Sequence, residues 1–428
     1  MATLERAAAG PELAWAYALR AQTCMLQNRT GGALDWGQRA IALAERVNAP
    51  EPLCHALNSV GTAELFADRP EGRAKLMRSL ELALAYRFHE QAARVYTNLG
   101  EYLVVTRDTA AAERWLDEGL AFDRRHDLDA WTYYLEGWLA QLRLDQGRLA
   151  DAQQLAQAVL YRPGLTLVMR LPALTVRARA GVRRGDPAAR AWLDEAHAAA
   201  RDTGEVQRVV PVVLALDEDA WLRDDLVAAR QALASVDAAA VAGLGGWERG
   251  ELAVWRRRAG LPDLAGPAAT AVALPWQLEL QGQPLAAAAA WRERSAPVEA
   301  ALALLQVPAL QPGADILAAL RDAQAGFESV GAGPGLRRTR ALAGALGLQR
   351  QLPGRRGPYR AARADPDGLT AREQRVLRAL ADGLPNEAIA AQLGVSRRTV
   401  ERHVSQVLAK LGVSSRAEAA RHARRRAP

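Results

Sequence analysis

The sequence predicts an all-α protein in which a solenoid of helical hairpins precedes a small helical domain. Three observations predict this fold class. Residues with high helix propensity, chiefly Ala, Leu, Arg, Glu and Gln, dominate the 428-residue chain, whereas aromatic residues make up 5% of it. A small/apolar/apolar triplet recurs along the first half of the chain. Near the C-terminus, helix-capping residues precede short amphipathic segments.

The recurring triplet has offsets of 0, +4 and +7, so its three members share one helical face. Breakers such as Gly31-Gly32 and Gly147 separate each triplet helix from an earlier amphipathic helix, which makes the unit a helical hairpin. One hairpin cannot bury its apolar face alone, but a stack of hairpins can. Successive triplets start 38 to 40 residues apart, at Ala33/Gly37/Ala40, Arg73/Met77/Leu80, Ala112/Leu116/Gly119, Asp151/Leu155/Ala158, Ala189/Leu193/Ala196 and Ala229/Leu233/Val236.

These hairpins resemble tetratricopeptide repeats, although their spacing exceeds the usual period of about 34 residues. A non-repetitive helical bundle is the alternative. After Val241 the pattern blurs, and it returns over residues 284–306 and 314–330. We therefore expect a repeat domain over residues 1–335 and a basic helix with a Pro/Gly/Arg linker over 336–366. A C-terminal domain over 367–428 is expected to follow.

Charge is distributed unevenly along the chain. Residues 336–428 hold 20 Lys and Arg against 7 Asp and Glu, whereas residues 1–335 hold 35 against 41. A basic end on an acidic body is expected when that end meets a polyanion, and a solvated Arg-rich surface is the alternative. The chain has two cysteines, Cys24 and Cys54, which is too few for a disulfide framework. It has no long apolar run and no signal peptide, so we expect a cytoplasmic protein.

The C-terminal segment contains the signals of three short helices. Thr370 and Glu373 form a capping box at the first helix, which Gly383 ends. Asn386 is expected to cap the second helix, about 386–393. Gly394 makes a turn, and Ser396 caps a third helix, about 397–410.

The third helix has an apolar stripe, which consists of Val400, Val404, Val407, Leu408 and Leu411. Its opposite side is polar and basic. A protein that recognises the DNA major groove through a helix-turn-helix requires two short helices, a glycine turn and a basic exposed face. The residues expected to contact DNA are Arg397, Arg398, Thr399, Glu401, Arg402, His403, Ser405, Gln406 and Lys410.

The segment from about 367 to 424 resembles the LuxR-type helix-turn-helix family. The resemblance rests on Leu-Thr-x-Arg-Glu at 369–373, Asn386, Ile389-Ala390, Ser396, Thr399-Val400, His403, Lys410-Leu-Gly-Val, Arg416 and Ala417. It implies a fourth helix over residues 415–424, which in the family pairs two subunits on DNA. Ala417, Ala420 and Ala423 are the small residues expected to lie in that pairing contact.

Three positions depart from the family pattern. Pro385 and Glu387 stand where Ser and a small or basic residue are usual, and Glu401 replaces a commonly basic residue. An acid at 401 would repel phosphate or accept from a cytosine amine, so base preference cannot be carried over. Region four of a sigma factor shares the early helices and is the competing resemblance, but the Glu-Arg-His-Val and Leu-Gly-Val-Ser-Ser-Arg segments favour the LuxR type.

Residues 291–305 and the Arg-Gly-Pro at 356–358 resemble the C-terminal half of large ATP-binding LuxR-type regulators. The two lysines, Lys75 and Lys410, lie in no phosphate-binding glycine loop, so no ATPase module is expected within this sequence. The sequence leaves open whether the chain is a natural short form. It also holds no metal, acyl-transfer or dinucleotide motif, which predicts a non-enzyme without cofactors.

The resemblance therefore implies a sequence-specific DNA-binding transcriptional regulator that acts as a homodimer on DNA. The repeats are interpreted as a module that senses a protein or small effector, and RNA polymerase is a further candidate partner. A repeat-based protein-interaction scaffold with weak or vestigial DNA binding is the alternative. Trp115, Trp131, Trp138 and Trp192 are interpreted as packing residues, with a ligand groove as the second interpretation.

Overall fold

The computed structural model describes residues 9–236, 241, 244–262, 272–352 and 367–426. Every regular element in these ranges is a helix, which confirms the predicted all-α class. The chain divides into two compact units, Met1–Leu352 and Pro353–Pro428. The predicted linker falls largely on residues 353–366, outside the described ranges. No helix in the described part of the chain is both long and apolar enough to cross a membrane.

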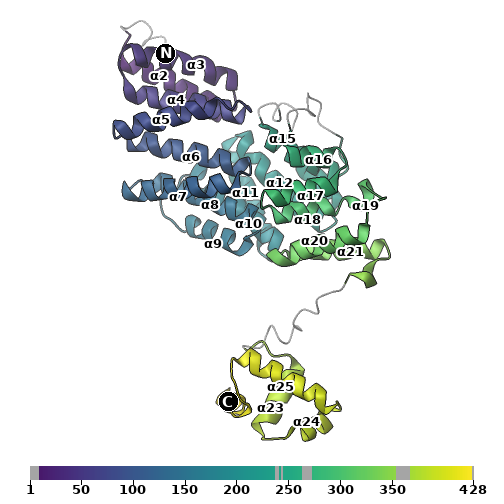
Figure 1. Ribbon diagram of the computed structural model, residues 1–428. Helices are drawn as coiled ribbons and strands as arrows, with labels where there is room; N and C mark the ends of the chain where they lie inside the picture. The colour runs from purple at the N-terminus through teal and green to yellow at the C-terminus, as the bar shows by residue number, and fades with distance from the viewer. Residues whose placement is uncertain (1–8, 237–240, 242–243, 263–271, 353–366, 427–428) are drawn as a thin grey trace. The chain divides into compact units, whose positions relative to one another are not determined.

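The first unit begins with six helical hairpins, coloured purple to teal in Figure 1. The first helix of each hairpin packs on the first helix of the next one, and the second helices of the first five hairpins pack between them. This arrangement is a solenoid, as the spacing predicts. The hairpins are α2 (Pro11–Leu26) and α3 (Thr30–Arg46); α4 (Pro50–Phe66) and α5 (Gly72–Ala85); α6 (His89–Val105) and α7 (Thr109–Arg125); α8 (Asp129–Asp145) and α9 (Leu149–Leu160); α10 (Leu167–Arg184) and α11 (Ala189–Thr203); and α12 (Val206–Leu222) and α13 (Leu226–Leu233).

Four of the six predicted triplets are buried, and two are wrong by one residue. In α5 the buried face starts at Gly72, not at Arg73, because a Cβ at position 72 would collide with the carbonyl oxygen of Gly61 in α4. In α9 it starts at Ala152, not at Asp151. The two corrected triplets are Gly72/Leu76/Ser79 and Ala152/Ala156/Val159.

A residue with a positive φ angle follows most helices of the stack and turns the chain into the next helix. Asn28, Asn48, Asp68 and Gly147 do so, with φ of 54°, 51°, 59° and 73°. Asn, Asp and Gly are the residue types that tolerate this conformation. Arg87 and Arg107 also adopt it, and no sequence signal predicts it there, because arginine rarely does.

The second half of the unit continues as shorter helices that pack back onto the stack (green in Figure 1). Helix α15 contacts α12, and α21 contacts both α10 and α12. The basic helix expected in the linker segment is α21, which packs here as part of the first unit. These elements are α15 (Gly246–Arg258), α16 (Leu274–Leu280), α17 (Pro284–Glu293), α18 (Pro297–Leu304), α19 (Val307–Leu310), α20 (Ile316–Val330), α21 (Gly333–Ala345) and η1 (Gln349–Gln351).

Segments that are far apart in the sequence meet because the stack curves. The Gln207 side-chain amide at the start of α12 donates to the carbonyl oxygen of Leu26 at the end of α2, 2.9 Å away and 181 positions earlier. Thr109 Oγ1 likewise donates to the carbonyl oxygen of Arg294 at 2.9 Å. The first and sixth hairpins therefore meet, and the start of α7 contacts the segment between α17 and α18.

The described part of the second unit, residues 367–426, contains four helices around a small apolar core of its own. Leu369, Val376, Ile389, Val400 and Val407 are among the buried residues of this core. The helices are α23 (Ala371–Ala381), α24 (Asn386–Leu393), α25 (Arg397–Leu411) and α26 (Arg416–Arg426). Four helices with a helix-turn-helix at α24–α25 are what the LuxR-type resemblance implies.

Candidate nucleic-acid interface

Helix α23 begins with the predicted capping box. The backbone N–H of Glu373 donates to Thr370 Oγ1 at 3.2 Å, and the backbone N–H of Thr370 donates to Glu373 Oε2 at 2.6 Å. Two of the backbone donors that a helix start leaves unpaired are thus satisfied by side chains. This fixes the first helix of the domain at the residue that the sequence indicates.

Lys410 joins the end of α25 to this capping box. Its Nζ lies 2.7 Å from Glu373 Oε2 and 3.1 Å from the carbonyl oxygen of Gly368. Burial alone raises the pKa of the Glu373 carboxyl, but the hydrogen bonds from Lys410 and Thr370 outweigh it and hold that pKa below its ordinary value. Lys410 is a residue expected on DNA, and in the free protein its ammonium is already engaged within the domain.

The start of α24 differs from the prediction that Asn386 caps it. The N-cap is Pro385, in an extended conformation and without a side-chain cap, and Asn386 is the first helical residue. The Asn386 side-chain oxygen instead accepts from the guanidinium of Arg416, which also donates to the carbonyl oxygen of Leu384 at 2.7 Å. Two residues of the family pattern therefore tie α26 to the start of α24.

The turn between α24 and α25 follows the prediction. Gly394 ends α24 in the left-handed conformation, with φ of 61°. Ser396 caps α25, since its hydroxyl accepts from the backbone N–H of Thr399 at 3.3 Å. The direction of α25 is thus set by a glycine turn and a cap within three residues.

Helix α25 has one buried and one exposed face. Val400, Val404 and Val407 are buried in the core of the domain. Arg398, Arg402, Ser405 and Gln406 are exposed, and Thr399 and His403 are half-buried at the flank, as the spacing predicts. Ser405 Oγ donates to the carbonyl oxygen of Glu401 at 3.1 Å, and Nδ1 of His403 is buried.

Arg397 differs from the two other arginines of this helix. Its guanidinium lies 3.0 Å from Glu387 of α24 and 3.0 Å from Glu401 one turn along α25. Arg398 and Arg402 have no ion pair among the described residues. The spacing of four residues between Arg397 and Glu401 is a sequence signal for this contact, which the expected DNA contacts did not take into account. Both acids that depart from the family pattern therefore hold one arginine.

The expected pairing surface on α26 is only partly accessible. Ala417 is exposed and Ala420 is half-buried, whereas Ala423 packs against the core of the domain. Ala419 is fully buried there. A carboxylate oxygen of Glu418 accepts from the backbone N–H groups of Ser414 and Ser415 and so caps the helix start. A partner helix could reach Ala417 and Ala420, but Ala423 less readily.

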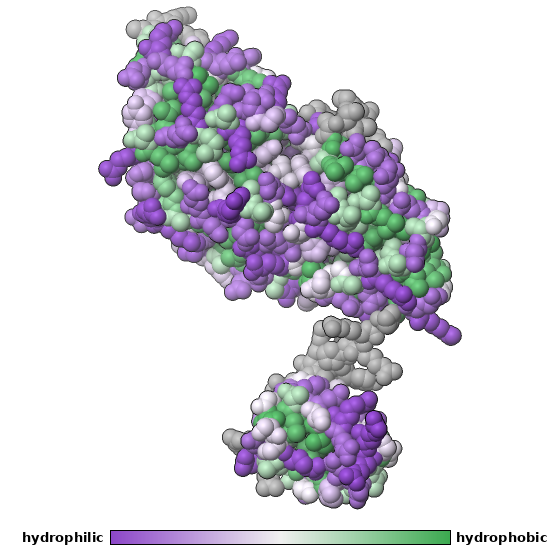
Figure 2. Space-filling model, viewed as in Figure 1, coloured by the Kyte–Doolittle hydropathy of each residue, from purple (hydrophilic) through white to green (hydrophobic). Residues whose placement is uncertain are grey.

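The surface of the second unit is polar. Figure 2 shows hydrophilic residues over much of its visible face, beside a smaller apolar area. Among the described residues, the exposed large apolar side chains all belong to the first unit. An exposed face of arginines and small polar side chains, backed by a buried apolar stripe, suits a polyanionic groove better than an apolar partner.

Comparison with known proteins places residues 367–423 in the family described as "Bacterial regulatory proteins, luxR family". The chain is 54% identical over 56 residues to the probable transcriptional regulatory protein SgaR of Hyphomicrobium methylovorum, and 45% identical over 56 residues to the nitrate/nitrite response regulator protein NarL of Escherichia coli. Each match covers 13% of this chain and 26% of the relative. A third relative, the DNA-binding transcriptional activator DevR/DosR of Mycobacterium tuberculosis, is 36% identical over 93 residues, 22% of this chain and 40% of its own. The chain thus spans about a quarter of the first two relatives.

Proposed function

We propose that this chain, whose residues 367–423 form a LuxR-family helix-turn-helix domain, is a sequence-specific DNA-binding transcriptional regulator. The observation that carries the proposal is the exposed face of α25, where Arg398 and Arg402 have no ion pair among the described residues. An arginine that is free of internal partners can fork onto a guanine edge or bind phosphate.

In this proposal α25 lies in the major groove and α24 crosses the backbone beside it. Arg398, Arg402 and Gln406 reach the bases or the phosphates along one side, and Thr399, His403 and Ser405 supply shorter polar contacts. Lys410 contributes mainly by holding the end of α25 on α23, because its ammonium is bound by Glu373.

In this proposal the affinity for DNA depends on three charged residues, Arg397, Glu387 and Glu401. The two carboxylates neutralise the arginine in the free protein, so a phosphate must compete with them for its guanidinium. Glu401 then either accepts from a cytosine amine or disfavours a close phosphate. An arginine neutralised in this way is also expected in a scaffold with weak or vestigial DNA binding. The experiment below distinguishes the two functions.

The repeat unit is the proposed sensing module, a non-catalytic part whose effector changes how the second unit binds DNA. We infer a homodimer on DNA, paired through Ala417 and Ala420 of α26, and a cytoplasmic protein with RNA polymerase as a further partner. Two half-sites one helical turn apart let a two-fold dimer double the contact of one small domain.

A gel-shift assay on genomic fragments at two salt concentrations tests the proposal with the full chain. We expect discrete fragments to be bound and the affinity to fall as salt rises, by a slope of about 0.9 for each phosphate contact. The variant with Arg397, Arg398 and Arg402 all replaced by Ala should lose this binding. Binding that is absent, or that is unchanged in the triple variant, would favour the scaffold function.

A further inference from the structure

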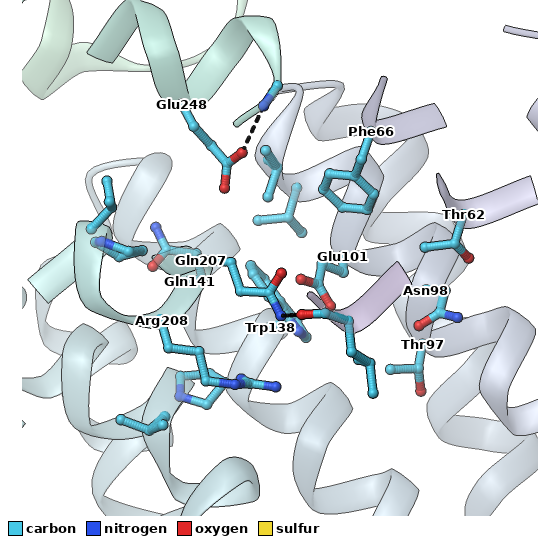
Figure 3. Close-up of a pocket in the computed structure, with 18 of the residues that line it drawn as sticks. Thr62, Phe66, Thr97, Asn98, Glu101, Trp138, Gln141, Gln207, Arg208 and Glu248 are labelled. Carbon is cyan, nitrogen blue, oxygen red and sulfur yellow. Dashed lines mark hydrogen bonds between the residues drawn. The ribbon is translucent and has the colours of Figure 1, made fainter. Parts of the chain in front are cut away.

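The first unit contains an open cavity of about 480 Å³ on the inner side of the hairpin stack. The inward-facing first helices of all six hairpins line it, together with α15 and α16. Figure 3 labels lining residues from α4, α6, α8, α12 and α15. A cavity of this size lies within the range of about 300–1,000 Å³ that is typical of small-molecule sites. Its walls include the first and the sixth hairpin, which meet at the hydrogen bond between Gln207 and Leu26.

Aromatic side chains form much of the wall. Trp131 and Trp138 of α8, which the sequence analysis interpreted as packing residues, face this cavity and are half-buried. Trp115 and Trp192 do pack: the Trp115 indole N–H donates to the carbonyl oxygen of Tyr96 at 3.0 Å, and Trp192 lies against Gly181. The further aromatic residues of the wall are Phe66, Tyr134, Trp247 and Trp276.

Three of the four arginines that line the cavity are neutralised by carboxylates. Arg107 pairs with Asp145, Arg179 pairs with Glu218 and Glu251, and Arg208 pairs with Glu205. The fourth, Arg94, donates a hydrogen bond of 2.8 Å to Nδ1 of His55. The positive charge of the wall is therefore largely compensated.

Two carboxylates of the wall have no such partner. Glu101 of α6 and Glu248 of α15 make no ion pair among the described residues. Glu101 accepts only a long hydrogen bond of 3.5 Å from the Tyr134 hydroxyl, and Glu248 accepts from the backbone N–H of Gly245 at 3.1 Å. Figure 3 shows both side chains at the cavity, which they approach from different helices.

The surroundings of both carboxylates disfavour their charged form. Burial raises the pKa of the Glu101 carboxyl to about 7; the nearby Arg208 lowers this pKa and the charge of Glu248 raises it. Burial also raises the pKa of Glu248. A cation that entered the cavity would relieve this cost, because it would stabilise the charged form of both groups.

Two further polar groups lie within the wall, and a bound molecule reaches them only if their side chains rotate. Thr62 and Thr97 line the cavity, and their buried hydroxyls have no hydrogen-bond partner in the described part of the chain. Each of them can donate and accept after rotation about χ1. A buried hydroxyl without a partner is costly, so a ligand that bonds to it gains affinity.

We propose that this cavity binds a small organic cation, with its ammonium group between Glu101 and Glu248 and an aromatic or apolar body against Trp131, Trp138 and Trp247. The aromatic faces suit the cation as well as its apolar body, because a ring attracts a positive charge placed over it. The inference rests on the proposed function to the extent that this cation is the effector sensed by the repeat unit. Because α6 belongs to the third hairpin and α15 follows the sixth, one molecule between Glu101 and Glu248 would tighten the curvature of the stack.

Calorimetry with three matched probes tests the site on the full chain. The probes are 2-phenylethylammonium, 2-phenylethanol and 3-phenylpropanoate, which carry one positive charge, no charge and one negative charge on similar bodies. We expect the cation to bind at least about tenfold more tightly than the other two. Equal binding of the three, tighter binding of the anion or no binding of the cation at millimolar concentration would overturn the proposal.

Variants locate the cation. Glu101→Gln and Glu248→Gln should each weaken binding of 2-phenylethylammonium by about tenfold or more, whereas Glu90→Gln, an exposed acid in the first turn of α6, should not. Titrations near pH 7 in two buffers of different ionisation enthalpy should show proton release on binding by the unaltered chain and less release by Glu101→Gln. Unchanged affinity in both glutamine variants would overturn the assignment. DNA binding by the same samples separates failure of this site from failure of the proposed function.

Discussion

Arg397 begins α25 but is held by two carboxylates, and this arrangement predicts a gain of function. In the double variant Glu387→Gln/Glu401→Gln the guanidinium is released and can reach a phosphate. DNA of unrelated sequence should bind more tightly, and the slope of affinity against salt should steepen by about 0.9, the value of one phosphate contact. Fluorescence anisotropy over a salt series measures both quantities.

The control for this prediction is the same double variant with Arg397→Ala added, which should return the salt slope to that of the unaltered chain. If the double variant binds unrelated DNA no better than the unaltered chain, Arg397 is turned away from the phosphates and the acids have another role.

Asp217 in α12 predicts a pH dependence of stability. It is fully buried, and neither of its carboxylate oxygens has a hydrogen-bond partner among the described residues. Burial raises its pKa to about 8; the charges of Arg258 and Arg179 lower it, and that of Glu218 raises it. Because the folded chain holds this proton more tightly than the unfolded chain, the stabilisation is complete below the ordinary pKa of 3.8 and is lost as the pH rises to about 8.

Asp217→Asn should remove this loss. We expect the melting temperature of the variant at pH 8 to exceed that of the unaltered chain by at least about 2 °C, with a smaller difference at pH 5. Differential scanning calorimetry at both pH values measures it, and Asp202→Asn, at an exposed acid of α11, is the control. An equal effect at the two pH values would contradict the assignment of the titration to Asp217.

At the scale of the elements, a buried charge network joins three helices of the first unit. Arg183 of α10 lies 2.7 Å from Glu218 of α12 and 2.9 Å from Glu299 of α18, and all three side chains are almost wholly buried. Removing one member of such a network leaves uncompensated charge in the interior. Arg183→Met should therefore lower the free energy of unfolding by roughly 3–5 kcal/mol.

Urea unfolding followed by circular dichroism measures this loss. Arg190→Met, which removes an exposed pair with Asp194 in α11, is the matched control and should cost less than about 0.5 kcal/mol. Similar unfolding midpoints for the two variants would mean that the network is not what holds α10, α12 and α18 together.

In the proposed dimer, two copies pair on DNA through α26. Ala417 and Ala420 permit close approach of a second helix, but they bury little apolar area and the contact is weak at about 25 cal/mol per Å². Ala420→Glu would place like charges across the pair. It should abolish cooperative binding to a probe with two half-sites and leave binding to a single half-site unchanged, as measured by gel shift. Cooperativity that persists in this variant would move the dimer contact to another surface, such as the repeat unit.

The sequence predicts most elements of both units, and the misses have physical reasons. Caps at Thr370 and Ser396 and the buried stripe of α25 are local features, so they could be read from spacing. The role of Asn386 depends on Arg416, 30 residues later, so a local rule assigned it to the wrong task. The two displaced triplets depend on how closely neighbouring helices approach, as at Gly72.

At the scale of the whole molecule, the sequence indicates a repeat domain and a helix-turn-helix domain, but it does not indicate the cavity within the repeat domain. The cavity exists because the stack curves until α15 faces α6, and no spacing in the sequence reports that curvature. Its tryptophans therefore look like packing residues, and Glu101 and Glu248 look like solvated acids. In the second unit, by contrast, the candidate contact residues lie on one helix, so their shared face follows from its periodicity.

The central claim is that α25 reads DNA sequence, and the specificity ratio of the full chain tests it most directly. The measurement is the affinity for a site selected from random DNA, divided by the affinity for unrelated DNA at the same salt concentration. We predict a ratio of about 10³ or more. Arg402→Ala should weaken binding to the selected site by roughly 1–3 kcal/mol and relax the base preference at one position. A ratio near one, or a selected site that Arg398→Ala and Arg402→Ala bind as tightly as the unaltered chain, would contradict the account.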